Sequence, residues 1–246
     1  MTRTGRALVT GGASGIGEAV ARRLATDGLH VTVADVDEGR AKEVAQAVGG
    51  EAWAVDLAEG EALDDLELDV DVLVNNAGLQ RVAPVEELAP ADFRRIQRVM
   101  VEAPFLLVRA ALPGMYERGF GRVVNVSSVH GLRASPHKVA YVAAKHALEG
   151  MSKVVALEGG PHGVTSSCVS PGFVRTPLVE HQVADQARLR GLEESQVLDE
   201  VLLAPAAVKR LVEPAEVADV VAYLASDRAA MVTGVSWTID GGWTAR

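Results

Sequence analysis

One serine, one tyrosine and one lysine have types and spacing suited to acid–base chemistry on an alcohol. Residues 122–126 (R-V-V-N-V) are apolar and β-branched, which predicts a buried strand, and two serines follow it, the second being Ser128. Residues 139–158 predict a helix, on which Tyr141 and Lys145 are spaced i, i+4 and share one face. A phenol has a pKa of about 10, and a neighbouring ammonium lowers that pKa. Tyr141 could therefore take a proton from an alcohol whose oxygen Ser128 holds.

A tyrosine and a lysine at this spacing are common on amphipathic helices, where they usually form a surface pair. The catalytic interpretation depends on a second feature, the turn T-G-G-A-S-G-I-G at 10–17, which follows a short apolar strand and begins a helix. Its glycines Gly11, Gly15 and Gly17 permit a tight turn and close approach of a pyrophosphate to the backbone. The N–H groups of the helix N-terminus attract phosphates. Together these features favour a dinucleotide-dependent enzyme.

Two acidic residues follow the next predicted strands, at 30–34 and 52–55. Asp35 stands where a carboxylate accepts hydrogen bonds from the adenosine ribose and repels a 2′-phosphate. No Arg or Lys lies between 34 and 38, so the sequence favours NAD over NADP. Asp56 suits either the adenine amino group or the N-cap of the following segment, and the sequence leaves both open.

Two further loops follow predicted strands at 72–74 and 164–169, and ligands bind at the carboxyl ends of strands in open α/β sheets. The first loop begins N-N-A-G and contains Gln80, and the second is fixed by Pro and Gly. The tract 178–211 is long, polar and without a strand pattern, which predicts a helical lid over the site.

The remaining pattern gives the other elements of the chain. We expect two helices within 90–118 with a turn or kink near Pro104, a helix at 214–226 and a last strand at 232–239.

Composition limits the class of protein. The 246 residues are 48% hydrophobic but only 4% aromatic, which favours one large α/β domain over residues 1–246. The net charge of −9 argues against nucleic-acid and anionic-membrane partners. A single cysteine, Cys168, excludes an intrachain disulfide, and we interpret it as a small buried side chain. With an early first strand and no apolar run of about 20 residues, we expect a cytoplasmic protein without a signal peptide, and we predict no metal site.

Several stretches resemble, in order and over the whole chain, the motifs of the short-chain dehydrogenase/reductase family: T-G-G-A-S-G-I-G at 10–17, Asp56-Leu57, N-N-A-G at 75–78, Ser128, Y-V-A-A-K at 141–145 and P-G-F-V-R-T at 171–176. The resemblance implies a Rossmann-type α/β domain with a doubly wound, seven-stranded parallel sheet and helices on both faces. It implies that Ser128 orients the substrate oxygen, Tyr141 is the acid/base, and Lys145 lowers the tyrosine pKa and binds the nicotinamide ribose. The implied cofactor contacts are Gly11, Ser14, Gly15, Ile16, Gly17, Asp35, Asp56, Leu57, Asn76, Ala77, Gly78, Tyr141, Lys145, Pro171, Gly172, Val174 and Thr176.

A narrower resemblance rests on Gly78-Leu79-Gln80, Ser128-Val129-His130-Gly131-Leu132, Lys138, R-T-P-L-V-E-H-Q at 175–182 and the ending G-G-W-T-A-R. In these stretches the chain is similar to the bacterial D-3-hydroxybutyrate dehydrogenases. The similarity implies that a substrate carboxylate is held by Gln80, His130, Lys138 and Gln182. A small buried anion needs charged or amide donors, and these four side chains supply them. The resemblance also implies a homotetramer, with the helices around 92–118 and 141–158 at one interface.

Two residues depart from the family pattern, and other functions remain open. Met100 stands where members usually have an asparagine of the proton relay, and Phe173 stands where the hydroxybutyrate enzymes often have tryptophan. One alternative is a reductase of 3-oxoacyl thioesters, or a dehydrogenase of another small hydroxy acid. Another is a non-catalytic nucleotide-sensing protein, although both Tyr141 and Lys145 are present.

Overall fold

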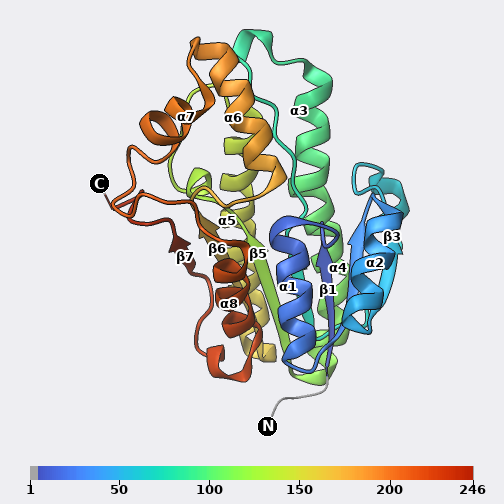
Figure 1. Cartoon of the computed structure of the whole chain (residues 1–246). Helices are drawn as coiled ribbons and strands as arrows, with labels where there is room; N and C mark the ends of the chain where they lie inside the picture. The colour runs from blue at the N-terminus through green and yellow to red at the C-terminus, as the bar shows by residue number, and fades with distance from the viewer. Residues whose placement is uncertain (1–4, 246) are drawn as a thin grey trace.

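The computed structural model describes residues 5–245, except for the side chains at 61, 62, 181, 189 and 190. Residues 1–4 and 246, which the single-domain prediction includes, lie outside the described residues. The described chain forms a seven-stranded, fully parallel sheet in the order β3-β2-β1-β4-β5-β6-β7 (Figure 1). Its strands are β1 (Arg6–Thr10), β2 (His30–Asp35), β3 (Glu51–Ala54), β4 (Val72–Asn75), β5 (Gly121–Val126), β6 (Val164–Pro171) and β7 (Ser236–Ile239).

The central strands are apolar because helices cover both faces of the sheet. Every residue of β4, β5 and β6 is buried, as expected for parallel strands packed on both sides. Val9 of β1 pairs with Val33 of β2 and Val74 of β4, so the chain runs outward from β1 in both directions. The point between β1 and β4 is where a doubly wound sheet opens a crevice for a ligand.

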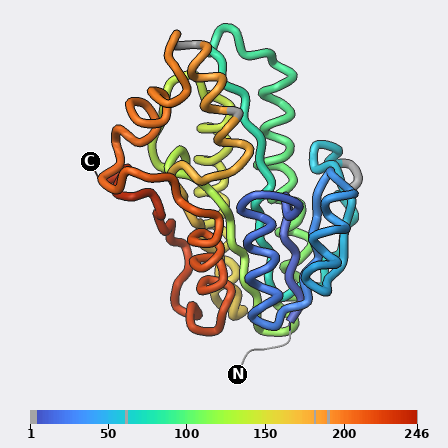
Figure 2. Tube along the Cα trace, viewed as in Figure 1, coloured from blue at the N-terminus to red at the C-terminus, as the bar shows by residue number. Residues whose placement is uncertain are grey.

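The helices divide between the two faces of the sheet, and alternate strand residues show this division. Val9 and Val74 belong to one core cluster, with α1 (Gly15–Thr26), α2 (Glu38–Val48) and α8 (Pro214–Ala225). Leu8 and Leu73, which point to the other face, belong to a second cluster with α4 (Ala103–Arg118) and α5 (Val139–Gly159). The tube view shows the coils of α1 and α8 side by side on one of these faces (Figure 2). The predicted doubly wound α/β fold is confirmed.

The region 90–118 differs from the two separate helices expected from the sequence. Helix α3 (Pro90–Gln97), a π-helical segment (Arg98–Glu102) and α4 follow one another without a break. Pro104 has no N–H to donate to the carbonyl of Met100, and the wide π turn just before it absorbs this interruption. The expected kink is therefore a change of helical pitch.

The same continuous helix, Pro90–Arg118, is long and apolar enough to cross a membrane by length and composition alone. Half of its apolar window is buried inside the protein, and Leu107, Ala111 and Met115 are fully buried in the second core cluster. It is a core helix.

The tract predicted as a lid is helical. It contains α6 (Pro177–Arg190), the short α7 (Glu194–Gln196) and a π turn (Val197–Leu202), and it has a small core of its own around Val179, Val197 and Leu202. In Figure 1, α6 and α7 lie beyond the carboxyl ends of the strands.

The last strand is shorter than predicted. Strand β7 begins at Ser236 rather than at 232, because Gly234 has φ +69° and its N–H donates to the Ser166 carbonyl, which turns the chain before the strand. Helix α8 ends at Ala225, close to the predicted end, and a capping box between Glu213 and Glu216 begins it.

Candidate active site

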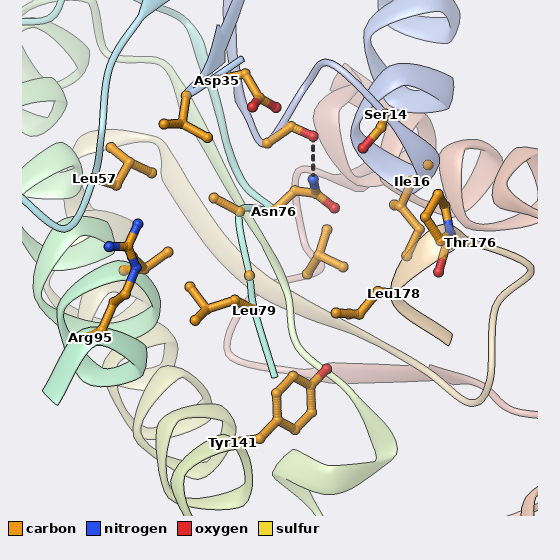
Figure 3. Close-up of a pocket in the computed structure, with 18 of the residues that line it drawn as sticks. Ser14, Ile16, Asp35, Leu57, Asn76, Leu79, Arg95, Tyr141, Thr176 and Leu178 are labelled. Atoms are coloured by element: carbon orange, nitrogen blue, oxygen red, sulfur yellow. Dashed lines mark hydrogen bonds between the residues drawn. The ribbon is translucent and has the colours of Figure 1, made fainter. Parts of the chain in front are cut away.

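A cavity of about 420 Å³ opens at the carboxyl ends of β1 to β5. Figure 3 shows Asp35 at one end of it and Tyr141 at the other, with Asn76 between them. Most of the residues predicted to bind the cofactor line this cavity: Gly11, Ser14, Gly15, Ile16, Asp35, Asp56, Leu57, Asn76, Ala77, Gly78, Tyr141, Lys145 and Thr176. Gly17, Pro171, Gly172 and Val174 are outside this lining.

The glycine-rich turn fits a dinucleotide because its backbone is packed too closely for side chains. A Cβ on Gly17 would lie 2.0 Å from the Gly11 carbonyl oxygen, so Gly17 supports the turn from behind. Gly15 has φ +53°, and a Cβ there would approach Thr176 Cγ2 at 3.1 Å. The turn and the loop before α6 are thus in contact, and the N-terminus of the 12-residue helix α1 faces the cavity.

Asn76 ties the loop after β4 to the end of β1. Its side-chain nitrogen donates to the Thr10 carbonyl at 2.9 Å and to the Gly11 carbonyl at 3.1 Å. Figure 3 draws one of these hydrogen bonds as a dashed line. The Thr10 hydroxyl accepts from the N–H groups of Asn76 and Ala77. This exchange holds the crevice between β1 and β4 at a fixed width.

The two acidic residues of the cavity are held by backbone N–H groups. Asp35 accepts from Ala13 N at 3.0 Å and from Asp37 N at 3.1 Å. Asp56 accepts from Ala58 N at 2.9 Å in an Asx turn, and its other oxygen lies 3.3 Å from the Arg95 guanidinium. The N-cap of the following 3₁₀ turn (Gly60–Leu63) is Glu59, so the capping alternative is wrong, and the place of Asp56 in the cavity lining keeps the adenine alternative as a proposal.

Ser128, Tyr141 and Lys145 come together as their spacing predicted. Ser128 follows β5, and its hydroxyl accepts from His130 N at 3.1 Å and forms a hydrogen bond with the Tyr141 hydroxyl. Lys145 Nζ lies 5.6 Å from the centre of the Tyr141 ring and donates to the Val126 carbonyl at 2.6 Å. The ammonium is thus anchored to the end of the same strand that carries the serine.

The expected lowering of the Tyr141 pKa by Lys145 stays a prediction, because burial has the largest effect on this pKa. Burial raises the pKa of Tyr141 to about 12, and the hydrogen bond from Ser128 opposes that rise. Burial lowers the pKa of Lys145 to about 8, while Cys168 and Glu149 oppose it. Burial is thus the largest influence on the pKa of both side chains, and Lys145 Nζ is directed to the Val126 carbonyl.

Two of the four predicted carboxylate ligands are in direct contact beside the tyrosine. Lys138 Nζ lies 3.2 Å from His130 Nε2, both side chains are buried, and the His130 ring centre is 6.1 Å from that of Tyr141. Burial and then the Lys138 charge lower the pKa of His130 to about 3. The histidine is therefore neutral at neutral pH, and Lys138 is the charge of the pair.

The other two predicted ligands, Gln80 and Gln182, contribute amides without partners. Gln80 is on the loop after β4 and Gln182 is on α6, and the Nε2 atom of each is buried with no hydrogen-bond partner among the described residues. A buried N–H without an acceptor costs about 1–3 kcal/mol, which a bound acceptor would recover.

A strained residue places Lys138. His137 has φ +67°, and among the described residues it is the one non-glycine in the left-handed region. Its carbonyl accepts from Ala83 N at 3.0 Å, which joins this turn to the loop that carries Gln80. Strain of this kind persists where surrounding contacts hold it, often at functional sites.

Sequence reasoning missed a tryptophan of the chain's tail. Trp243 stacks on His130 with ring centres 5.8 Å apart, and its buried Nε1 has no partner among the described residues. Phe173 meets His130 edge-on at 6.1 Å and lies under the Lys138 ammonium. Only 4% of the chain is aromatic, so a tryptophan in the C-terminal tail was the signal in the sequence that could have indicated a role for Trp243.

Comparisons with known proteins agree with this geometry. The family model described as enoyl-(acyl carrier protein) reductase matches residues 11–244. The D-beta-hydroxybutyrate dehydrogenase of Rhizobium meliloti (strain 1021) is 42% identical over 260 residues, covering 100% of both chains. The chain belongs to the short-chain dehydrogenase/reductase family.

Solved structures show the same fold. One described as a short chain dehydrogenase/reductase family protein has a TM-score of 0.89 and 35% identity over 100% of both chains. Another, a candidate NAD(P) dependent gluconate 5-dehydrogenase from Beutenbergia cavernae, holds NADP at low occupancy. It has a TM-score of 0.86 and 32% identity over 98% of this chain and 97% of its own. A nicotinamide dinucleotide is the cofactor typical of the family, and this cavity fits one.

Proposed function

We propose that this oxidoreductase interconverts D-3-hydroxybutyrate and acetoacetate with NAD as its cofactor. The observation that carries the proposal is the buried Lys138–His130 pair beside Tyr141. A buried ammonium forms a strong, charge-assisted hydrogen bond with a carboxylate, and the neutral imidazole beside it adds no second positive charge. The Rhizobium meliloti relative named for this substrate supports the same assignment.

The proposed chemistry assigns one role to each side chain. The carboxylate of the substrate binds Lys138, with His130, Gln80 and Gln182 as further donors. Ser128 and Tyr141 then hold the C3 hydroxyl, and the Tyr141 oxygen, as phenolate, takes its proton. NAD, when bound, would supply the acceptor for the hydride that leaves C3. In the reverse direction Tyr141 returns the proton to the ketone oxygen. Lys145 stabilises the phenolate by its charge.

The proposed preference for NAD rests on Asp35. Two backbone N–H groups fix its carboxylate at the end of the cavity, where it would meet a 2′-phosphate with like charge. The Beutenbergia cavernae structure holds NADP, so membership of the family does not decide between the two dinucleotides. The proposed preference therefore rests on this chain's own residues.

The deciding experiment is a spectrophotometric screen of D- and L-hydroxy acids, with NAD and with NADP, on the wild-type protein and on Lys138→Ala. We expect turnover of D-3-hydroxybutyrate with NAD. Lys138→Ala should reduce kcat/KM for this acid roughly ten- to hundredfold, since one charge-assisted hydrogen bond is worth about 1.5–3 kcal/mol. Butan-2-ol is the control substrate, because it has no carboxylate for Lys138 to bind.

Equal losses for the acid and for butan-2-ol would show that Lys138 is structural. Lys42→Ala is the matched control variant, because this exposed lysine pairs with Glu38 on α2, away from the cavity lining. It should leave both activities unchanged.

A second candidate is a reductase of 3-oxoacyl thioesters, which the description of the family model favours. It belongs in the same screen, with acetoacetyl thioesters and either reduced dinucleotide as substrates. Faster turnover of a thioester than of acetoacetate would replace the hydroxy-acid assignment.

We propose the following setting for this activity. The chain is a single domain over residues 1–246 and a cytoplasmic homotetramer. Its partner is a small hydroxy acid, and nucleic acids and membranes are not partners.

A further inference from the structure

A buried carboxylate lies one helical turn beyond the proposed catalytic lysine. Glu149 follows Lys145 on α5 at i, i+4, so the two side chains share one helix face. Glu149 is 6% exposed and Lys145 is 4% exposed. Carboxylates are almost never buried to this degree unless they are hydrogen-bonded or paired with a charge. The proposed reaction assigns Glu149 no role.

Two serine hydroxyls from neighbouring strands anchor this carboxylate. Its Oε1 accepts from Ser170 Oγ of β6 at 2.8 Å and from Ser236 Oγ of β7 at 3.0 Å. The two hydroxyl oxygens are themselves 2.8 Å apart. Hydrogen bonds to a carboxylate favour its ionised form, and two of them from separate strands fix its position.

Lys145 needs a negative charge nearby. Its ammonium has three donors, of which one is directed to the Val126 carbonyl at 2.6 Å. Burial lowers its pKa to about 8, and Cys168 and Glu149 act in the opposite direction. A neutral amine could not stabilise a phenolate, so the proposed chemistry depends on the ammonium form.

Among the groups within the described chain that face Lys145 and Glu149, the Glu149 carboxylate is the one able to supply that charge. Cys168 of β6 is buried, and burial first and Glu149 second raise the pKa of its thiol, which stays uncharged while Lys145 titrates. Burial likewise raises the pKa of Tyr141 on α5. From β5 and β7 the pair meets the Val126 carbonyl and the Ser236 hydroxyl, which do not titrate.

We propose that Glu149 is a positioning residue: its serine-anchored carboxylate is the buried counter-ion that keeps Lys145 charged at the site. The proposal rests on the role assigned to Lys145 and adds a residue that touches neither substrate nor cofactor. If Glu149 only joined α5 to β6 and β7 through its hydrogen bonds, a neutral amide could replace it without effect on Lys145. A counter-ion, in contrast, must change the ionisation of Lys145, and this ionisation can be measured directly.

The test is a titration of Lys145 by NMR on protein labelled with ¹³C at lysine Cε, without substrate or cofactor. The chain has five lysines (Lys42, Lys138, Lys145, Lys153 and Lys209), and the Lys145 signal is the one that Lys145→Arg removes. Glu149→Gln keeps an oxygen acceptor for the serines and removes the charge. We expect the Lys145 midpoint to fall by at least one pH unit, a tenfold change in its ionisation constant.

Ser152→Ala is the matched control. It removes another buried polar group of α5, a hydroxyl 2.9 Å from Ser166 Oγ, without touching Glu149. The Lys145 midpoint should stay within about 0.3 units of wild type. An unchanged midpoint in Glu149→Gln, or an equal fall in both variants, would overturn the proposal.

Two further measurements keep the proposal testable if Glu149→Gln does not fold. Glu149→Met removes the charge without leaving an amide to satisfy and should lower the midpoint equally. In the wild-type protein, a Lys145 midpoint at or below pH 6 would contradict an acting counter-ion. Because the titration uses no substrate, its result stands even if the screen of hydroxy acids fails.

Discussion

At the scale of single residues, spacing predicted which candidate reactive groups lie together but not what surrounds them. The i, i+4 spacing brings Tyr141 and Lys145 to one face, and the serine that ends β5 reaches the tyrosine hydroxyl. Spacing carries no information on burial, and burial raises the pKa of Tyr141 to about 12. Burial thus disfavours the phenolate that the proposed reaction requires of Tyr141, and the substitution of this residue gives the strongest test of the proposal.

Tyr141→Phe should fold and bind NADH but lose at least nine-tenths of kcat, since only the phenolic oxygen that moves the proton is removed. A tenfold loss corresponds to about 1.4 kcal/mol of barrier. Steady-state kinetics with D-3-hydroxybutyrate and NADH fluorescence measure the two effects separately. A variant that retained more than a tenth of wild-type kcat would refute the acid/base assignment.

Asp35→Ala should narrow the preference for NAD over NADP, because the variant lacks the carboxylate that would repel the 2′-phosphate. The measurement is the ratio of kcat/KM for the two dinucleotides in wild type and variant. Asp37→Ala is the control, since this exposed residue caps α2 through Arg40 N and does not line the cavity. Comparable kcat/KM values of the wild-type protein with NAD and with NADP would contradict the proposed preference.

His130 should make the folded state sensitive to acid. Its pKa is lowered to about 3, below its value in the unfolded chain, so between those two values the unfolded state binds a proton that the folded state does not. This contribution to stability is complete above about pH 6.5 and is lost as pH falls toward 3. The free energy of unfolding, measured with urea between pH 7 and 4 in buffers without carboxylates, should fall less steeply in His130→Gln.

The exposed His162 provides the control for that slope. His162→Gln should keep the wild-type pH dependence of the free energy of unfolding. Parallel curves for wild type and His130→Gln would show that His130 titrates normally.

At the scale of elements, the sequence predicted what is local and missed what depends on distant contacts. The glycine turn, β1 and α1 follow from neighbouring residues, and the turn joins a strand to a helix as predicted. Trp243 reaches His130 only because the tail folds back, with Ala207 N and Val208 N donating to the Gly241 carbonyl. The late start of β7, at Ser236, likewise depends on a distant contact, the hydrogen bond from Gly234 N to the Ser166 carbonyl of β6.

The lid should loosen independently of the sheet. Its small core around Val179, Val197 and Leu202 is separate from the two clusters that pack on the sheet. Val197→Ala removes two buried methyl groups from this core. It should speed amide exchange in α6, α7 and the π turn and leave exchange in β4 and β5 unchanged. Hydrogen exchange with mass spectrometry measures both regions at once. Faster exchange throughout the sheet would show that the lid is part of the global unfolding unit.

At the scale of the whole molecule, apolar side chains remain exposed on the two helices proposed to form an interface. Phe93 and Phe105 on the helix 90–118 are 38% and 53% exposed, and Val154 and Leu157 on α5 are 53% and 80% exposed. A groove on the first helix contains both phenylalanines. Exposed apolar patches of this kind mark protein–protein contacts, and a second copy of the chain is the occupant that the homotetramer proposal names.

The double variant Phe105→Glu, Leu157→Glu should therefore break the assembly. A charge placed at the centre of an apolar interface loses its water on association, and like charges from symmetric copies face each other across a two-fold axis. Sedimentation velocity at micromolar concentration should give a tetramer for wild type and a smaller species for the variant. Val85→Glu, at a site 66% exposed on the 3₁₀ turn Val85–Glu87, is the matched control and should remain tetrameric. A wild-type monomer would contradict the proposal outright, and a variant tetramer would place the interface on another face.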